Sequence, residues 1–155
     1  MTYSTLSYTL KYVPHREFDR IYTLYTRDCG KIEAVARGSQ KILSKLRGHL
    51  EPGILTEVLI ANGKRREVLC EACLASRQTS QSQVPTDNFI FAKLIFLQKF
   101  LHNFNQLVPL GDQDVDLFEF LGNFIRDQAL SQTMAEIKKT YGDYSLRLLE
   151  KLGYR

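Results

Sequence analysis

The spacing of apolar residues changes once along this chain, and this change limits the folds that it can form. Up to about residue 75 the apolar residues occur in short alternating runs, as in 6–12, where leucine and tyrosine alternate with serine, threonine and lysine. This two-residue period is typical of a half-buried strand. Beyond Pro85 the apolar residues recur every three or four positions, which is typical of amphipathic helices. The sequence therefore predicts a β-structure followed by a helical unit.

Five short strands are predicted in the first half, at about 6–12, 20–27, 30–37, 53–61 and 67–75. Asn62-Gly63, between the last two runs, is a strong signal for a β-hairpin. A helical turn is expected between the third and fourth strands, beginning at Ser39. Five short antiparallel strands with such an insertion favour a small closed barrel of the oligonucleotide-binding (OB) type.

Three helices are predicted in the second half. The first follows Pro85, with Thr86 or Asp87 as its cap, and ends before Pro109. The second begins near 112–114. Thr133 and Glu136 form a capping box at the start of the third, which continues through Gly142, with or without a kink. The fold class is therefore α+β: an N-terminal five-stranded OB-fold-like antiparallel barrel with a C-terminal bundle of about three helices. We assign the barrel domain to 1–78, the helical domain to 79–155, and a polar linker to about 76–86.

The positive charge of the chain is concentrated in the predicted barrel. The formal net charge is +4, and the basic excess lies in the first 77 residues. This distribution is expected if that half binds a polyanion. The predicted phosphate-binding residues lie in the basic stretch 30–49 and at the tip of the hairpin: Lys31, Arg37, Lys41, Lys45, Arg47, Lys64, Arg65 and Arg66. The alternative is that these side chains only solvate surface loops. Tyr22 and Tyr25 are candidates for stacking on bases, or for packing in the core.

No pattern in the sequence indicates catalysis or a bound cofactor, and we do not expect an enzyme. Cys70 and Cys73 have the spacing of a zinc knuckle, but they lie in a predicted strand without a second ligand pair. The acidic residues at 112–116 lack the glycine and the distal glutamate of a calcium loop. Three cysteines and the absence of a signal-like N-terminus favour a reducing, cytoplasmic compartment.

Short motifs along the chain resemble the RecO family of bacterial recombination mediators. The resemblance is strongest at YTRDCGKIEAVARG and at SKLRGHLEP, and the final YSLRLLEKLGYR resembles the helical region of that family. It implies an OB-fold barrel that binds single- and double-stranded DNA and anneals complementary strands. It also implies loading of the RecA recombinase on strands coated by single-strand-binding protein (SSB), with SSB, RecR and RecA as partners, and a cytoplasmic, nucleoid-associated protein. Family members continue into further helices, often with a cysteine-bound zinc, for which the positions of Cys70 and Cys73 are unsuitable.

Two other functions remain open from the sequence. The helical half could dock a partner peptide in a groove while the barrel serves only as a scaffold. Alternatively, the barrel could bind RNA, because contacts to phosphate do not distinguish the two nucleic acids.

Overall fold

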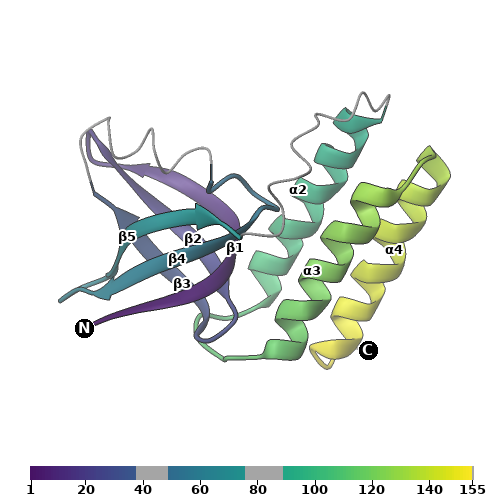
Figure 1. Cartoon of the computed structure of the whole chain (residues 1–155). Helices are drawn as coiled ribbons and strands as arrows, with labels where there is room; N and C mark the ends of the chain where they lie inside the picture. Colours follow the sequence, from purple (N-terminus) through teal and green to yellow (C-terminus); the bar gives the residue numbers. More distant parts are fainter. Residues whose placement is uncertain (38–48, 76–88, 155) are drawn as a thin grey trace.

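The computed structural model describes residues 1–37, 49–75 and 89–154. A closed five-stranded barrel is followed by a bundle of helices that packs beside it (Figure 1). This arrangement confirms the predicted fold class. The strands are β1 (Thr2–His15), β2 (Asp19–Thr26), β3 (Gly30–Ala36), β4 (Leu55–Asn62) and β5 (Glu67–Leu74). The helices are α2 (Ile90–Leu107), α3 (Val115–Leu130) and α4 (Met134–Lys151).

The barrel has the strand order β1-β2-β3-β5-β4, and β4 returns to pair with β1. All neighbouring strands are antiparallel except β3 and β5, which pair in parallel at Ala34–Glu67 and Val35–Val68. This parallel pair departs from the antiparallel barrel that was predicted. It closes the barrel and places the β4–β5 loop against β3, which matters for the site described below.

The middle of β1, from Ser7 to Leu10, is buried on both faces, so the prediction of a half-buried strand was wrong for this part of the element. Tyr8 and Leu10 pack against the helices, while Ser7 and Thr9, on the opposite face, are also buried. This part of the strand lies between the barrel interior and the helical bundle, whereas residues 11–14 beyond it are exposed. A bulge between Thr9 and Lys11 shifts the register halfway along the strand.

The predicted hairpin between β4 and β5 is confirmed, but its turn is longer than a two-residue one. Four residues, Gly63 to Arg66, connect the strands, and Gly63 does not adopt a positive φ. A Cβ atom at Gly63 would lie 2.1 Å from the carbonyl oxygen of Arg66. Glycine is therefore required here because the backbone approaches itself closely.

The helix boundaries follow the expected caps at two of the three starts. The Asp114 carboxylate accepts a hydrogen bond from the Leu117 amide at 3.0 Å. Thr133 Oγ1 accepts one from the Glu136 amide at 3.1 Å, and the Glu136 carboxylate accepts from the Gln132 amide at 2.6 Å. α2 instead begins after Phe89 without a side-chain cap, and the predicted caps Thr86 and Asp87 lie outside the described residues. α4 runs through Gly142 without interruption.

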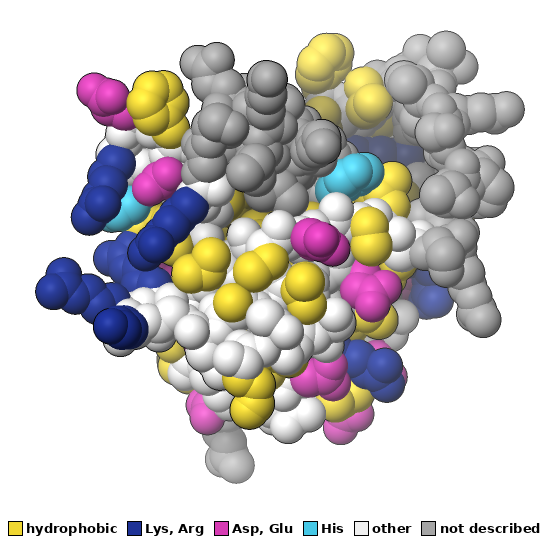
Figure 2. Space-filling model, turned by 60° about the vertical axis from the view of Figure 1, so that its left-hand side comes forward, with side chains coloured by type: hydrophobic (Ala, Val, Ile, Leu, Met, Phe, Trp, Pro, Cys, Tyr) yellow, Lys and Arg dark blue, Asp and Glu magenta, His cyan; other side chains and the backbone are white. Residues whose placement is uncertain are grey.

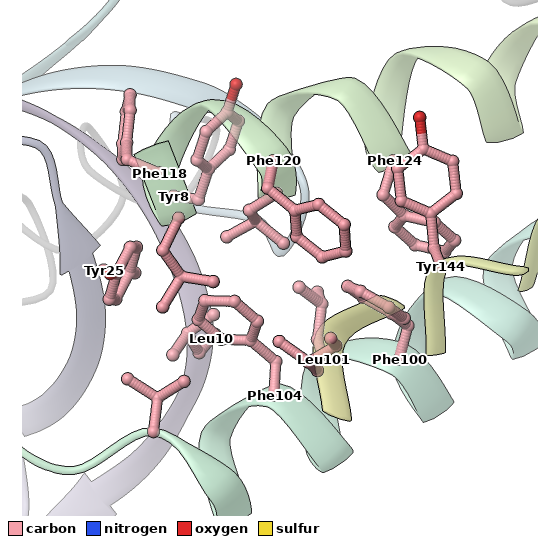
Figure 3. Close-up of a cluster of buried hydrophobic side chains, with 14 residues drawn as sticks. Tyr8, Leu10, Tyr25, Phe100, Leu101, Phe104, Phe118, Phe120, Phe124 and Tyr144 are labelled. Carbon is pink, nitrogen blue, oxygen red and sulfur yellow. The ribbon is translucent and has the colours of Figure 1, made fainter. Parts of the chain in front are cut away.

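An aromatic core joins the barrel to the helices (Figure 3). Tyr25 of β2 meets Phe104 of α2 edge to face, with ring centroids 4.9 Å apart, and Tyr8 of β1 lies 5.1 Å from Phe118 of α3. A second core, which includes Tyr22 and Leu24, fills the barrel itself. The two halves of the chain thus share buried surface, and the helices hold one wall of the barrel in place.

Candidate nucleic-acid interface

Four arginines surround one hollow on the surface of the barrel. The hollow has a volume of about 230 Å³, and its lining consists of His15, Arg16, Asp19, Val35, Arg37, Arg65 and Arg66. We call it the arginine pocket. Figure 2 shows Lys and Arg side chains gathered around a His side chain at the left edge of the molecule.

Three separate segments supply these arginines. Arg16 lies in the three-residue turn between β1 and β2, which connects the paired residues His15 and Asp19. Arg37 directly follows β3, and Arg65 and Arg66 belong to the β4–β5 loop. Parallel pairing of β5 with β3 brings this loop to the end of the barrel where β3 leaves it. The β1–β2 and β4–β5 loops are also the loops with which OB-folds bind oligonucleotides.

The charge of the arginine pocket favours an anion. The described residues that line it include four arginines and His15 but one acidic residue, Asp19. Among the described residues, none of the four arginines forms an ion pair or a side-chain hydrogen bond. Arginine stays protonated at any physiological pH and presents its donors in a planar fork that matches phosphate oxygens. The arrangement is therefore suited to binding phosphate groups.

The structure brings together some of the predicted phosphate-binding residues. Arg37, Arg65 and Arg66 line the arginine pocket, and the exposed Lys64 precedes them in the same loop. Lys41, Lys45 and Arg47 lie outside the described residues, so their part in the site stays a prediction. Sequence reasoning missed Arg16. The signal available was its place in the turn after Pro14, which becomes informative once an OB-fold is expected and that turn is treated as a binding loop.

Lys31 does not line the arginine pocket, so its role in binding phosphate stays a prediction that this surface does not support. Its Nζ donates hydrogen bonds to the carbonyl oxygens of Asn105 and Val108, both at 2.8 Å, at the C-terminal end of α2. Burial lowers the pKa of the Lys31 ammonium. Helix C-termini present unpaired carbonyls and a partial negative charge, so a cation there stabilises the helix end.

Next to Lys31 the backbone links the same two parts of the chain. The amide of Gly111 donates to the carbonyl of Lys31 at 2.8 Å, and the amide of Lys31 donates to the carbonyl of Gly111 at 3.2 Å. A Cβ atom at Gly30, where φ is +70°, would lie 2.1 Å from the Gly111 carbonyl oxygen. Lys31, the second residue of β3, therefore links the barrel to the helical bundle through both its side chain and its backbone.

Tyr22 and Tyr25 cannot stack on bases, because both side chains are fully buried. Tyr22 belongs to the barrel core and Tyr25 to the core shared with the helices. The alternative of core packing is correct for both. Strand alternation alone could not decide this, since it separates two faces of β2 but does not show that each face is covered.

Cys70 and Cys73 are free, exposed thiols in β5, the strand in which they were predicted. In the described part of the chain, no group of three or more His, Cys, Asp or Glu side chains is placed to hold a metal ion. Within the same residues, no helix is long and apolar enough to cross a membrane.

Comparison with known proteins places the barrel in a family. Residues 1–73 match the family model described as "Recombination protein O N terminal". A protein named DNA repair protein RecO from a Synechococcus strain is 45% identical over 64 residues, which cover 41% of this chain and 21% of the relative. The protein of the same name from Bifidobacterium adolescentis is 46% identical over 56 residues, or 36% of this chain and 23% of the relative.

A third relative extends the match into the helices. DNA repair protein RecO from Gloeothece citriformis is 29% identical over 136 residues, covering 86% of this chain and 46% of the relative. The chain thus spans about half the length, or less, of the curated relatives it matches. Residues 1–73 therefore match the N-terminal domain of the RecO family, and the closed five-stranded barrel that they form is consistent with this match.

Proposed function

We propose that this protein binds single- and double-stranded DNA through the arginine pocket and anneals complementary strands. The observation that supports this most directly is the convergence of Arg16, Arg37, Arg65 and Arg66, from three segments, on one hollow. The hollow lies between the loops with which OB-folds hold oligonucleotides.

Binding of this kind carries little sequence preference. Contacts from guanidinium groups to phosphates position a strand but do not distinguish its bases. Two strands held on one cationic surface repel each other less and meet more often, so pairing is accelerated without a catalytic group. We therefore propose a non-enzymatic annealing activity that needs no cofactor.

The wider role follows from the relatives, which are named DNA repair proteins. We propose that this protein acts in DNA repair and recombination and assists RecA loading on SSB-coated strands, with SSB, RecR and RecA as partners. The helical half offers an apolar surface for a partner: Phe91, Leu94 and Ile95 of α2 are exposed at spacings of three and four residues, on one side of the helix. The same surface supports the alternative of a protein-interaction module.

A titration at several salt concentrations tests DNA binding. We expect the wild-type chain to bind single-stranded DNA with a log–log salt slope of about −3, from four phosphate contacts at roughly −0.7 each. The double variant Arg65→Glu with Arg66→Glu should lose most of this affinity. Lys138→Glu with Lys139→Glu, an equal charge change on α4, serves as the matched control and should bind like the wild type. Equal losses in both variants, or a slope near zero, would contradict an interface at the arginine pocket.

Annealing is tested with complementary strands, naked and coated with SSB. We expect the wild type to accelerate pairing of naked strands and the double arginine variant to do so far less. Unchanged annealing by that variant would favour the interaction module over the arginine pocket. Tighter binding to RNA than to DNA of the same length would favour an RNA-binding barrel.

A further inference from the structure

Phe18 is an exposed aromatic side chain in a turn whose neighbouring residues line the arginine pocket. It lies in the three-residue turn between β1 and β2, and 52% of its surface is accessible. Arg16 and Asp19, on either side of it in the chain, both line the arginine pocket. With about half of its surface exposed, the ring gains only part of the free energy that full burial would give, so stability alone does not explain its position.

Other exposed aromatic side chains do not combine these properties. The ring of Tyr12 is covered by the Arg20 guanidinium, 4.5 Å from its centroid, and packs against the ring of Tyr22 at 5.5 Å. Phe91 lies on α2 and Tyr154 follows α4, so neither adjoins the arginine pocket. Among the described residues, Phe18 makes no ring–ring or cation–π contact. About half of its surface is accessible to a ligand.

A nucleic-acid strand carries phosphates and bases side by side, and this turn offers an arginine and an aromatic ring two residues apart. In a single strand the base projects beside its phosphate, so a strand whose phosphates contact the arginines places a base near the turn. Bases stack on aromatic side chains whatever their identity, because each has a π-face. In a duplex the bases are already stacked on one another and are not accessible to the ring.

We propose that Phe18 stacks on an unpaired base and gives the arginine pocket a preference for single strands over duplexes. This inference rests on the proposed function, since the arginines must hold the phosphates for the ring to meet a base. Phe18 then allows this surface to distinguish an unpaired strand from a duplex. Phosphate contacts alone distinguish the two poorly, because both carry the same backbone groups.

The test compares three probes of equal length on the full chain: oligothymidylate, an abasic oligonucleotide with the same phosphates, and a duplex. Removing one base–aromatic stack by Phe18→Ala should weaken oligothymidylate binding by about tenfold. Abasic and duplex affinities should stay unchanged. Phe91→Ala, which removes an exposed phenylalanine from α2, is the matched control and should leave all three affinities unchanged.

A second variant reports on stacking directly. The chain contains no tryptophan, so Phe18→Trp introduces a single indole fluorophore. We expect oligothymidylate to quench its emission and the abasic strand to quench it much less, while Phe91→Trp should respond to neither. Circular dichroism of each variant shows whether the fold is kept.

The outcomes separate the two proposals. If the wild type binds no probe at low salt, both the proposed function and the role of Phe18 are overturned. If the wild type binds, only the stacking role is overturned when Phe18→Ala weakens the binding of oligothymidylate and of the abasic strand equally. The same holds when the variant weakens the binding of neither. A loss of affinity for oligothymidylate alone, together with selective quenching of the Phe18→Trp emission by that probe, supports the stacking role.

Discussion

Replacing Lys31 by methionine removes two hydrogen bonds that join the barrel to the helical bundle. In the wild type the Nζ group donates to the carbonyls of Asn105 and Val108 at 2.8 Å. Methionine keeps much of the aliphatic length of the side chain but offers no donor. The two carbonyls at the end of α2 then depend on water.

The expected loss can be worked from these contacts. A hydrogen bond from a charged donor contributes about 1.5–3 kcal/mol net, so two would give roughly 3–6 kcal/mol at most. Two effects reduce this figure. Lys31 is only half-buried, so water can replace part of the lost bonding, and its lowered pKa shows that burial already opposes its charge. We expect the free energy of unfolding to fall by about 2–3 kcal/mol, and Tm by about 5–10 °C for a chain of this size.

Thermal and urea unfolding, followed by far-UV circular dichroism, measure the loss. Lys11→Met is the matched control: Lys11 is exposed on β1 and raises the electrostatic cost of the Lys31 charge, so its removal should leave Tm unchanged or slightly raised. Below its Tm, Lys31→Met should bind single-stranded DNA like the wild type. Unchanged Tm with a large loss of DNA affinity would refute this reasoning and restore Lys31 as a phosphate ligand.

Further predictions concern glycines and cysteines. Gly142→Ala should raise the free energy of unfolding by about 0.5–1 kcal/mol, because the residue lies inside α4 and a Cβ there meets no atom within 4 Å; a lowered Tm would contradict this. Gly30→Ala should destabilise the fold strongly, because φ is +70° and the new Cβ would overlap the Gly111 carbonyl. A Tm within 2 °C of the wild type, which corresponds to a loss of roughly 1 kcal/mol or less, would count against this close contact. Cys70→Ser with Cys73→Ser should leave Tm unchanged, with or without a chelator, because both thiols are free and exposed; stoichiometric zinc in the purified protein would overturn this.

Local patterns were sufficient for much of the fold. Short apolar runs bounded by turn residues located all five strands, and Asn62-Gly63 indicated the β4–β5 hairpin. The Thr133–Glu136 capping box marked the start of α4. Each of these signals depends on residues a few positions apart, so it can be recognised in the sequence without knowledge of the tertiary structure. The RecO-like motifs added the barrel type, which the matched family and the observed strand order confirm.

The arginine pocket could not be predicted from local patterns, because residues far apart in the sequence form it. Arg16, Arg37 and Arg65 are separated by more than 20 residues from one another, and closure of the barrel through the parallel β3–β5 pair brings them to one hollow. Lys31 looked like its basic neighbours, yet it binds the end of α2, more than 70 residues away. The sequence left Tyr25 open between stacking on bases and packing in the core, and the contact with Phe104 of α2 places it in the core. The sequence determines the charge of each residue and the spacing of the apolar residues. Only closure of the barrel and packing of the helices decide which of these side chains contact solvent, a phosphate or a distant helix end.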